Sequence, residues 1–288
     1  MGLHVKNLKS LLQLVRFEHG IMYGVGVFIG AVLAGWNLSF NFSVFLGFLI
    51  ALTLEIGAFA LNDYIDYKAD VINKRKDRPI VRGDVSRDVA LLIGVFGFLA
   101  ANLASLYFVQ NNLEAFLLIF LFSVFSILYN YWLKRFALIG NVFIGLTMAL
   151  PFIFGGLMLR NVNDAIAILA GMAFIIGLGR EIMKDAEDVE GDKKVGAKTL
   201  PAVLGIKKSV YSVIICYVLG IALSIVPIFT FFSTKPIYIT ILAADAILLY
   251  VSFKILRSQK LETFRSGRKW SLYATAIALL VFLLSSIF

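Results

Sequence analysis

The sequence predicts an all-α, polytopic membrane protein of nine transmembrane helices around a central cavity, with cap loops on the cytoplasmic side. Of its 288 residues, 60% are hydrophobic, and the mean hydropathy is +0.89. A soluble domain of this length has no interior large enough for so many apolar side chains. Most of the apolar stretches have about 20 residues, enough to cross the hydrocarbon layer as a helix. They lie at 17–36, 40–62, 89–110, 113–132, 138–159, 164–183, 209–232, 236–253 and 270–288.

The distribution of basic residues predicts how these spans cross the cell membrane. All but Arg160 and Lys235 of the 27 Lys and Arg residues fall at the N-terminus and in every second connection. The positive-inside rule therefore places the N-terminus and the connections at 67–88, 180–208 and 254–269 in the cytoplasm, and the C-terminus outside. Eight or ten spans would put a basic loop on the wrong side. The net charge of +9 is explained by this asymmetry, so we expect no nucleic-acid partner.

The composition also excludes several kinds of site. Cys216 is the single cysteine, and the two histidines are His4 and His19, so neither a disulfide nor a Cys- or His-rich metal site is possible. The basic segment 1–16 enters an apolar run without a small-residue cleavage signal. We interpret that run as the first membrane anchor.

The chain is predicted to be one domain, 1–288, made of two four-helix halves. The halves cover about 11–135 and 136–256, and a ninth helix follows at 269–288. Each half carries spaced aspartates at the end of its second helix, followed by a basic loop and a turn containing Gly and Pro. This similarity indicates a weak internal duplication.

The first acidic motif reads Asn62-Asp63-Tyr64-Ile65-Asp66-Tyr67-Lys68-Ala69-Asp70. Its residues Asn62, Asp66 and Asp70 are spaced i, i+4, i+8, so they share one helix face, and Asp63 borders that face. Carboxylates stacked in this way repel one another unless a cation lies among them.

The second acidic motif reads Asp185-Ala186-Glu187-Asp188-Val189-Glu190-Gly191-Asp192, and its aspartates at i, i+3 and i+7 again share a face. Donors that are all oxygen suit Mg²⁺, for which Mn²⁺ can substitute. A single acidic helix end is usually only solvated, but two matched ends at the membrane boundary indicate function. We therefore expect two clusters that clamp a diphosphate through Mg²⁺. The expected metal ligands are Asn62, Asp63, Asp66, Asp70, Asp185, Asp188 and Asp192.

These motifs resemble those of the UbiA superfamily of intramembrane prenyltransferases, whose pattern is Asn-x-x-x-Asp-x-x-x-Asp followed later by Asp-x-x-x-Asp. The resemblance extends over nearly the whole chain. It includes Asp77-Arg78-Pro79-Ile80, Gly83-Asp84-Val85-Ser86, Tyr129, Lys134, Gly140-Asn141 and Lys198-Thr199-Leu200-Pro201. Arg16 matches a first-helix arginine, but the family's following Pro and Asn are replaced here by Phe17 and His19.

The resemblance implies ionisation of an allylic diphosphate assisted by Mg²⁺, followed by attack of an acceptor on the allylic cation. It implies catalytic roles for Asp66, Asp70, Asp188, Asp192 and Lys134. Substrate binding falls to Asn62, Arg16, Arg78, Arg82, Tyr129, Lys184 and Glu55, with Arg180 as a further candidate cation. The rings of Tyr64 and Tyr67 are candidates to stabilise the allylic cation, although interfacial tyrosines are common. Glu55 or His19 is a candidate base, and Glu55 and Asp245 are also interpretable as hydrogen-bonding links between helices.

The expected partners are a prenyl diphosphate donor, a lipid or aromatic acceptor and membrane lipid, with no obligate protein partner. Glu181 to Asp192 is most similar to the archaeal digeranylgeranylglyceryl phosphate synthases of that superfamily, which implies a geranylgeranyl donor and geranylgeranylglyceryl phosphate as acceptor. By contrast, Arg16-Phe17-Glu18-His19 resembles aromatic-acid prenyltransferases of quinone synthesis.

Two other classes of membrane protein are alternatives that the acidic motifs fit less well. A cation-coupled transporter would carry its acidic site near the bilayer midplane. A CDP-alcohol phosphotransferase would continue Asp63-x-x-Asp66 with Gly, where Tyr67 stands.

Overall fold

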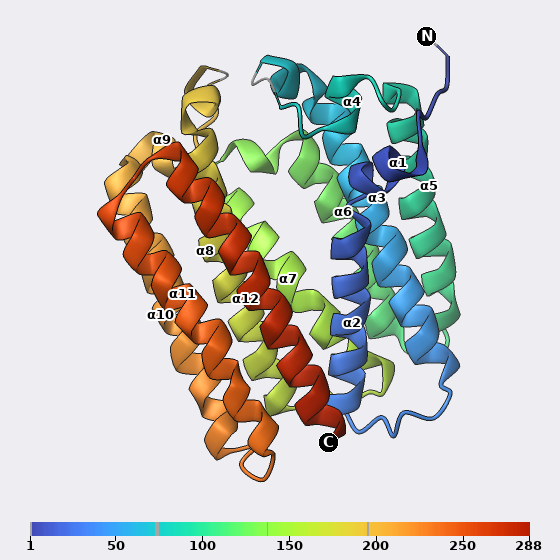
Figure 1. The fold of residues 1–288 in the computed structure, drawn as a ribbon. Coiled ribbons are helices and arrows are strands. Elements are labelled where there is room, and N and C mark those ends of the chain that lie inside the picture. The colour runs from blue at the N-terminus through green and yellow to red at the C-terminus, as the bar shows by residue number, and fades with distance from the viewer. Residues whose placement is uncertain (1, 73–74, 137, 195) are drawn as a thin grey trace.

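The structure is a computed structural model that describes residues 2–72, 75–136, 138–194 and 196–288; of Arg135 and Asp192 it describes the backbone alone. Over these residues the protein is a bundle of helices, with two isolated β-bridges between loop segments. The prediction of an all-α membrane protein is confirmed (Figure 1).

Each predicted span is a helix. Eight helices in the described chain are long and apolar enough to cross a membrane. The first predicted span is α2, a shorter apolar helix that is not among these eight. The helices that correspond to the predicted spans are α2 (Phe17–Leu33), α3 (Phe42–Ile72), α5 (Arg87–Ser105), α6 (Leu113–Tyr131), α7 (Ile139–Met158), α8 (Asp164–Lys194), α10 (Ile206–Phe229), α11 (Ile241–Arg257) and α12 (Leu261–Ile287).

Two of these helices, α3 and α8, extend well beyond their predicted apolar spans. Each has 31 residues, because the polar sequence of the acidic motif continues the helix instead of ending it. The motifs therefore occupy rigid helix extensions at the boundary of the apolar region, and their side chains keep the helical spacing predicted from the sequence.

Short elements cover the same end of the bundle (Figure 1). They are α1 (Leu8–Leu14), α4 (Pro79–Arg82), α9 (Leu200–Leu204) and the 3₁₀ turn η2 (Leu133–Arg135); two more such turns, η1 (Leu106–Phe108) and η3 (Pro236–Thr240), lie elsewhere. Asn7 begins α1 by accepting a hydrogen bond from the Ser10 amide at 2.8 Å. A bridge between Val5 and Val85 joins the N-terminal segment to the loop after α4.

Two large hydrophobic clusters form most of the interior, and a small third one joins α1, α4 and α5. One is built from α2, α3, α5, α6 and α7, and the other from α7, α8, α10, α11 and α12, with part of α2. Helices α2 and α7 join them by close backbone packing, because a Cβ added at Gly30 would meet the Phe152 carbonyl and one at Gly155 the Val27 carbonyl, each at 2.1 Å. The division into two halves by duplication stays a prediction.

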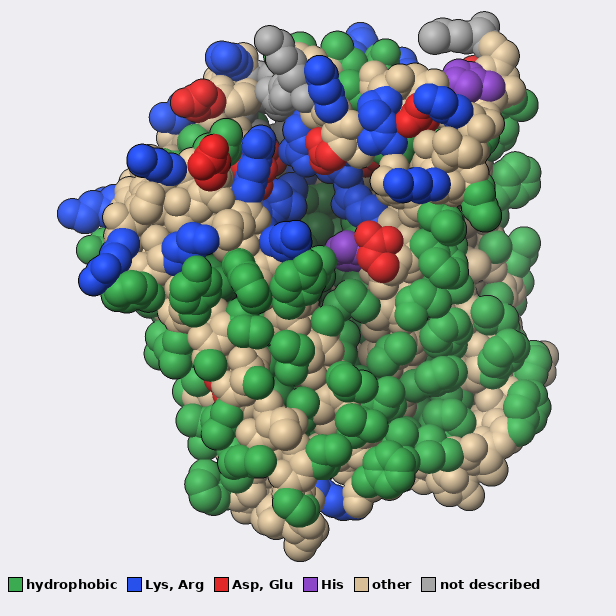
Figure 2. All heavy atoms as spheres, in the orientation of Figure 1, with side chains coloured by type: hydrophobic (Ala, Val, Ile, Leu, Met, Phe, Trp, Pro, Cys, Tyr) green, Lys and Arg blue, Asp and Glu red, His purple; other side chains and the backbone are tan. Residues whose placement is uncertain are grey.

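The surface separates into a charged end and an apolar body (Figure 2). Large side chains such as Phe96, Leu99 and Phe253 are more than half exposed, which is expected where lipid is the solvent. The two termini lie at opposite ends of the bundle, as an odd number of crossings requires (Figure 1). The protein is therefore a multi-pass membrane protein.

Candidate active site

A cavity of about 800 Å³ opens at the charged end of the bundle. It is lined by α2, α3, α6, α7, α8 and α12 and by residues 75–78 of the loop after α3. Basic side chains surround a hollow in this part of the surface (Figure 2). Two smaller apolar pockets adjoin the cavity farther along the helices, and Tyr23 lines all three spaces.

The first acidic motif lies on α3 with the predicted shared face. Asn62 Nδ2 donates to Asp66 Oδ2 at 3.0 Å and to Asn130 Oδ1 of α6 at 2.8 Å. Lys134, from the turn after α6, forms an ion pair with Asp66. This contact joins two residues predicted for the site from distant parts of the sequence. Burial lowers the pKa of Lys134 from its usual value, against the opposing effect of Asp66.

Two arginines hold the buried side of this motif. Arg16 Nη2 and Arg78 Nη1 lie 3.3 and 3.2 Å from Asp63 Oδ1, and Arg78 Nε lies 3.8 Å from Asp70 Oδ2. Asp63 is 2% exposed, and its Oδ2 has no hydrogen-bond partner. Arg16 also stacks on Phe59, 4.3 Å from the ring centre. The first-helix arginine is therefore directed at the acidic motif although Phe17 and His19 replace the family's residues.

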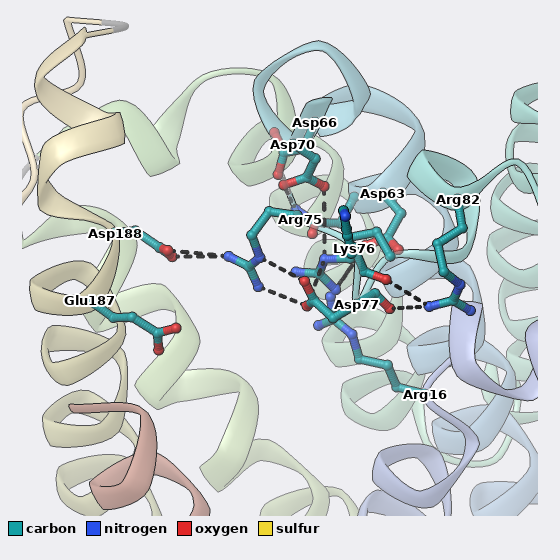
Figure 3. A network of polar contacts seen from close by, with 12 residues as sticks. Arg16, Asp63, Asp66, Asp70, Arg75, Lys76, Asp77, Arg82, Glu187 and Asp188 are labelled. Atoms are coloured by element: carbon teal, nitrogen blue, oxygen red, sulfur yellow. Dashed lines mark hydrogen bonds and ion pairs between the residues drawn. The ribbon is translucent and has the colours of Figure 1, made fainter. Parts of the chain in front are cut away.

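Arg75 connects the two acidic motifs. Its Nη1 lies 3.2 Å from Asp188 Oδ1 on α8, and its Nε and Nη2 each donate to Asp77 at 3.1 Å (Figure 3). Although burial opposes both shifts, this pairing raises the pKa of Arg75 and lowers that of Asp77. The backbone N–H of Arg75 also donates to the Asp70 carbonyl at 2.9 Å, so this residue links the end of the first motif to Asp188 of the second.

The rest of the second motif makes separate contacts on α8. Asp185 Oδ2 accepts a hydrogen bond from Asn141 Nδ2 of α7 at 2.6 Å, and Lys184 donates to Glu181 at 2.5 Å. Asp192 belongs to the last turns of α8, and its side chain lies outside the described residues.

The cavity brings some of the predicted residues together and leaves others outside. Those that line it are Arg16, Glu55, Asn62, Arg78, Tyr129 and Lys184. Asp63, Asp66 and Asp70 lie beside it through their contacts with Arg16, Asn62 and Arg78. Asp188 reaches it through Arg75, and Lys134 through Asp66. Arg82 points elsewhere: it binds Asp84 at 2.7 Å, Gln13 at 2.7 Å and the carbonyls of Lys76 and Asp77.

Several other candidates also find their places. Arg87 lies over the rings of Tyr64 and Tyr67, 4.8 Å from each centre, and neither tyrosine lines the cavity. His19, which does line it, lies edge-on to Phe59. Asp245 accepts a hydrogen bond from Ser224 of α10 at 2.7 Å, so it links two helices.

Several residues that line the cavity were not predicted from the sequence. Arg75 is one of several basic residues in its loop, and only its position just after the Asp70 turn distinguishes it. Arg265, Arg268 and Lys269 of α12 line the cavity as well, and the two arginines bind Glu187 of α8 at 3.0 and 2.6 Å. No sequence pattern separated these three from other positive-inside residues.

The donor set fits a divalent ion of the Mg²⁺ type in chemistry, since every candidate ligand is an oxygen donor. In the described part of the chain, no three acidic, His or Cys side chains are already grouped around one metal position. Instead, arginine and lysine side chains form ion pairs with Asp63, Asp66, Asp70 and Asp188. This arrangement fits an ion that arrives with phosphate oxygens and takes one or two carboxylates, as Mg²⁺ commonly does.

The fold and these motifs define an intramembrane prenyltransferase. The UbiA prenyltransferase family matches residues 24–273, and the chain belongs to this family. It is 38% identical to the digeranylgeranylglyceryl phosphate synthase of Archaeoglobus fulgidus, over 96% of this chain and 94% of that protein. It is 33% identical to the enzyme of the same name from Thermococcus kodakarensis, over 97% and 98%.

Solved structures agree with the fold. One described as digeranylgeranylglyceryl phosphate synthase in membranes matches with a TM-score of 0.72 and 29% identity, over 97% of this chain and 98% of the other. A UbiA homologue from Archaeoglobus fulgidus bound to DMAPP and Mg²⁺ matches with a TM-score of 0.64 and 18% identity, over 95% and 99%. At that identity the second match supports the fold alone.

Proposed function

We propose that the protein transfers a geranylgeranyl group from geranylgeranyl diphosphate to geranylgeranylglyceryl phosphate, as a step of archaeal ether-lipid synthesis. The observation that carries the proposal is the link that Arg75 makes between Asp70 of the first motif and Asp188 of the second, at the mouth of a cavity that adjoins apolar pockets. A polar, cation-rich mouth suits a diphosphate, and the apolar continuation suits its prenyl chain. The named relatives above support the choice of substrates.

The metal would be held by aspartates of both motifs. Asp66, Asp70, Asp188 and Asp192 are the proposed catalytic ligands, assisted by Asn62, Asp63 and Asp185. When bound, Mg²⁺, or Mn²⁺ in its place, would neutralise charge on the leaving diphosphate.

The chain's own cations would complete the diphosphate site. Arg16, Arg78, Lys134 and Lys184 are proposed to bind its oxygens, and Arg75 joins them because it lies between the motifs. The bond between prenyl C1 and the diphosphate oxygen breaks with its electron pair going to oxygen, so donors placed at that oxygen stabilise the transition state. Arg82 then acts as a positioning residue, because it holds the carbonyls of the loop that carries Arg78.

The acceptor hydroxyl oxygen forms the new bond to prenyl C1 and loses its proton. Glu55 is the proposed base. Among the described carboxylates that line the cavity, Glu181, Glu187 and Asp77 are in ion pairs, whereas Glu55 is 6% exposed and forms none within 4.0 Å. Tyr129, stacked on Phe143 at 4.9 Å, would form part of the wall beside the allylic cation.

The orientation follows from the positive-inside rule: the N-terminus and the motif-bearing end would face the cytoplasm, and the C-terminus the outside. Accessibility tags placed in the segments 67–88 and 180–208 should both report cytoplasmic. Tags that report opposite sides would contradict the shared diphosphate site.

The experiment that tests the function is prenyl transfer by the purified protein in nanodiscs with radiolabelled geranylgeranyl diphosphate. We expect an ether product with geranylgeranylglyceryl phosphate, its loss with a chelator and its return with Mg²⁺. Transfer to 4-hydroxybenzoate without ether product would replace the lipid acceptor by an aromatic acid. No transfer to either acceptor would contradict the proposal.

A further inference from the structure

The cavity has a second basic wall, from which the proposed diphosphate site takes Lys184 alone. It is formed by α8 and α12, whose lining cations are Arg180, Lys184, Arg265, Arg268 and Lys269. Two carboxylates of the same wall oppose them: Glu181, which binds Lys184, and Glu187, which binds Arg265 and Arg268. The α8/α12 wall therefore keeps a surplus of positive charge after its internal pairs are formed.

The surplus extends into the membrane-spanning part of α8 through Arg180. This residue precedes Asp188 by two helical turns, roughly 12 Å along the axis, and it lines the cavity. Its Nη1 is buried and has no hydrogen-bond partner, and no carboxylate of the described residues lies within 4.0 Å of the guanidinium in an ion pair. A buried cation with an unused donor is costly unless a ligand supplies an oxygen.

We propose that the α8/α12 wall binds the phosphate monoester of the acceptor, with Arg180, Arg268 and Lys269 as its donors. This inference rests on the proposed function and adds the place of the acceptor's headgroup. A phosphate monoester carries a charge of roughly −1.5 to −2 at neutral pH and three strong acceptor oxygens. The planar fork of an arginine matches two such oxygens at once, so this wall needs no metal to hold the group.

The position of the wall fits the reaction. Glu187 and Asp188 are neighbours on α8, and Asp188 binds Arg75 of the loop after α3 (Figure 3). Glu187 instead binds Arg265 and Arg268 of α12. A phosphate held beside α12 would therefore lie across the cavity from the donor diphosphate, with the acceptor's glycerol between them. Separate sites also keep two highly charged anions apart, which reduces their repulsion.

Glu187 is a built-in competitor for the same arginines. The acceptor phosphate would displace it from Arg265 and Arg268, so Glu187→Gln should free both guanidinium groups. This gives the inference a second, opposite signature: neutralising a cation weakens acceptor binding, and neutralising Glu187 strengthens it. A merely structural α8–α12 link would make both changes harmful.

The test measures KM for each substrate in zwitterionic nanodiscs, which keep the bilayer phosphodiesters constant. We expect Arg268→Gln and Arg180→Gln each to raise KM for geranylgeranylglyceryl phosphate at least about tenfold, because a charge-assisted donor is lost, and to leave the donor KM within about threefold. Glu187→Gln should lower the acceptor KM. Lys260→Gln is the matched control, since Lys260 is an exposed cation just before α12 that does not line the cavity.

Binding of the acceptor to the Asp66→Asn variant, followed by calorimetry, separates this inference from the proposed function. Geranylgeranylglyceryl phosphate should bind to this variant. Geranylgeranylglycerol, which lacks the phosphate, should bind at least about tenfold more weakly, and adding Arg268→Gln should weaken binding of the phosphate ligand by at least about the same factor. Phosphate-dependent binding to this variant, together with no transfer activity of the unsubstituted protein, would retain the site and reject the function. Two results would overturn the site and retain the function. One is ether synthesis with an acceptor KM that is unchanged by substitution of Arg180, Arg268 and Glu187, and the other is an equal rise in the KM values of donor and acceptor.

Discussion

The two basic walls of the cavity treat anions differently. On the wall formed by α3 and the loop that follows it, the aspartates and the cations pair with one another: Asp63 with Arg16 and Arg78, and Asp66 with Lys134. Arg75 of this loop pairs with Asp188 of α8. On the α8/α12 wall the cations outnumber the carboxylates, and Arg180 has a donor without a partner. The first wall can bind a diphosphate only with added positive charge, whereas the second already attracts a phosphate. Arginines that line a cavity therefore indicate an anion-binding site only when the carboxylates that pair with them are counted as well.

The largest expected effect is loss of a carboxylate from either acidic motif. Asp66→Asn and Asp188→Asn should each lower turnover by at least about 10²-fold, because loss of one ligand removes a few kcal/mol of stabilisation from the leaving diphosphate. The same loss should follow chelation of the divalent ion. Turnover at saturating substrates measures both.

The control for that prediction is Glu190→Gln. Glu190 is an exposed carboxylate two residues after Asp188 on the same helix, so its neutralisation should change turnover less than about threefold. Near-normal activity of Asp66→Asn or Asp188→Asn would reject these residues as metal ligands.

A smaller effect is expected when the guanidinium between the motifs is removed. Arg75→Gln should lower turnover about tenfold, because a donor to the leaving group is lost. It should also lower the Mg²⁺ concentration that gives half-maximal rate, because Arg75 competes with the ion for Asp188. Mg²⁺ titrations of the initial rate measure both changes, with exposed Lys68 of α3 replaced by Gln as the control. A higher Mg²⁺ requirement would show that Arg75 assembles the metal site instead of competing for it.

The smallest effect is expected for Arg82, a cation outside the cavity. Its hydrogen bonds join the loop at 76–77 to α1 and to Asp84. Arg82→Gln should therefore cost about 1–2 kcal/mol of stability and change turnover less than about threefold. Thermal unfolding in nanodiscs and steady-state rates test this. A loss of donor affinity without a change in thermal stability would place Arg82 in the diphosphate site after all.

Much of the fold and part of the site could be predicted from the sequence. Span length and hydropathy fix the helices, because the bilayer imposes one length on each crossing. Helical spacing fixed the face shared by Asn62 and Asp66, since that relation is local. The resemblance assigned Asp66 and Lys134 to the same site, but their contact was not predicted, because no local rule joins residues that far apart in the sequence.

The remaining site residues depend on tertiary packing. In the sequence, the positive-inside rule explains Arg75, Arg82 and Arg268 equally well. In the structure, Arg75 binds Asp188, Arg82 binds the carbonyl of Asp77 in a loop, and Arg268 binds Glu187. Asn130 was also missed, because the hydrogen bond that it accepts from Asn62 joins α6 to α3. The lengths of α3 and α8 were underestimated because polar residues ended the apolar count without ending the helices.

Equilibrium binding with and without a chelator tests most directly whether the two walls divide the two substrates. The protein in nanodiscs would be titrated with geranylgeranyl diphosphate and, separately, with geranylgeranylglyceryl phosphate, each in excess Mg²⁺ and in excess chelator. Binding of the diphosphate should weaken at least about 10²-fold without the ion, and binding of the phosphate should change less than about threefold. Equal dependence of both ligands on Mg²⁺ would contradict the account, because it would place both anions on the aspartates.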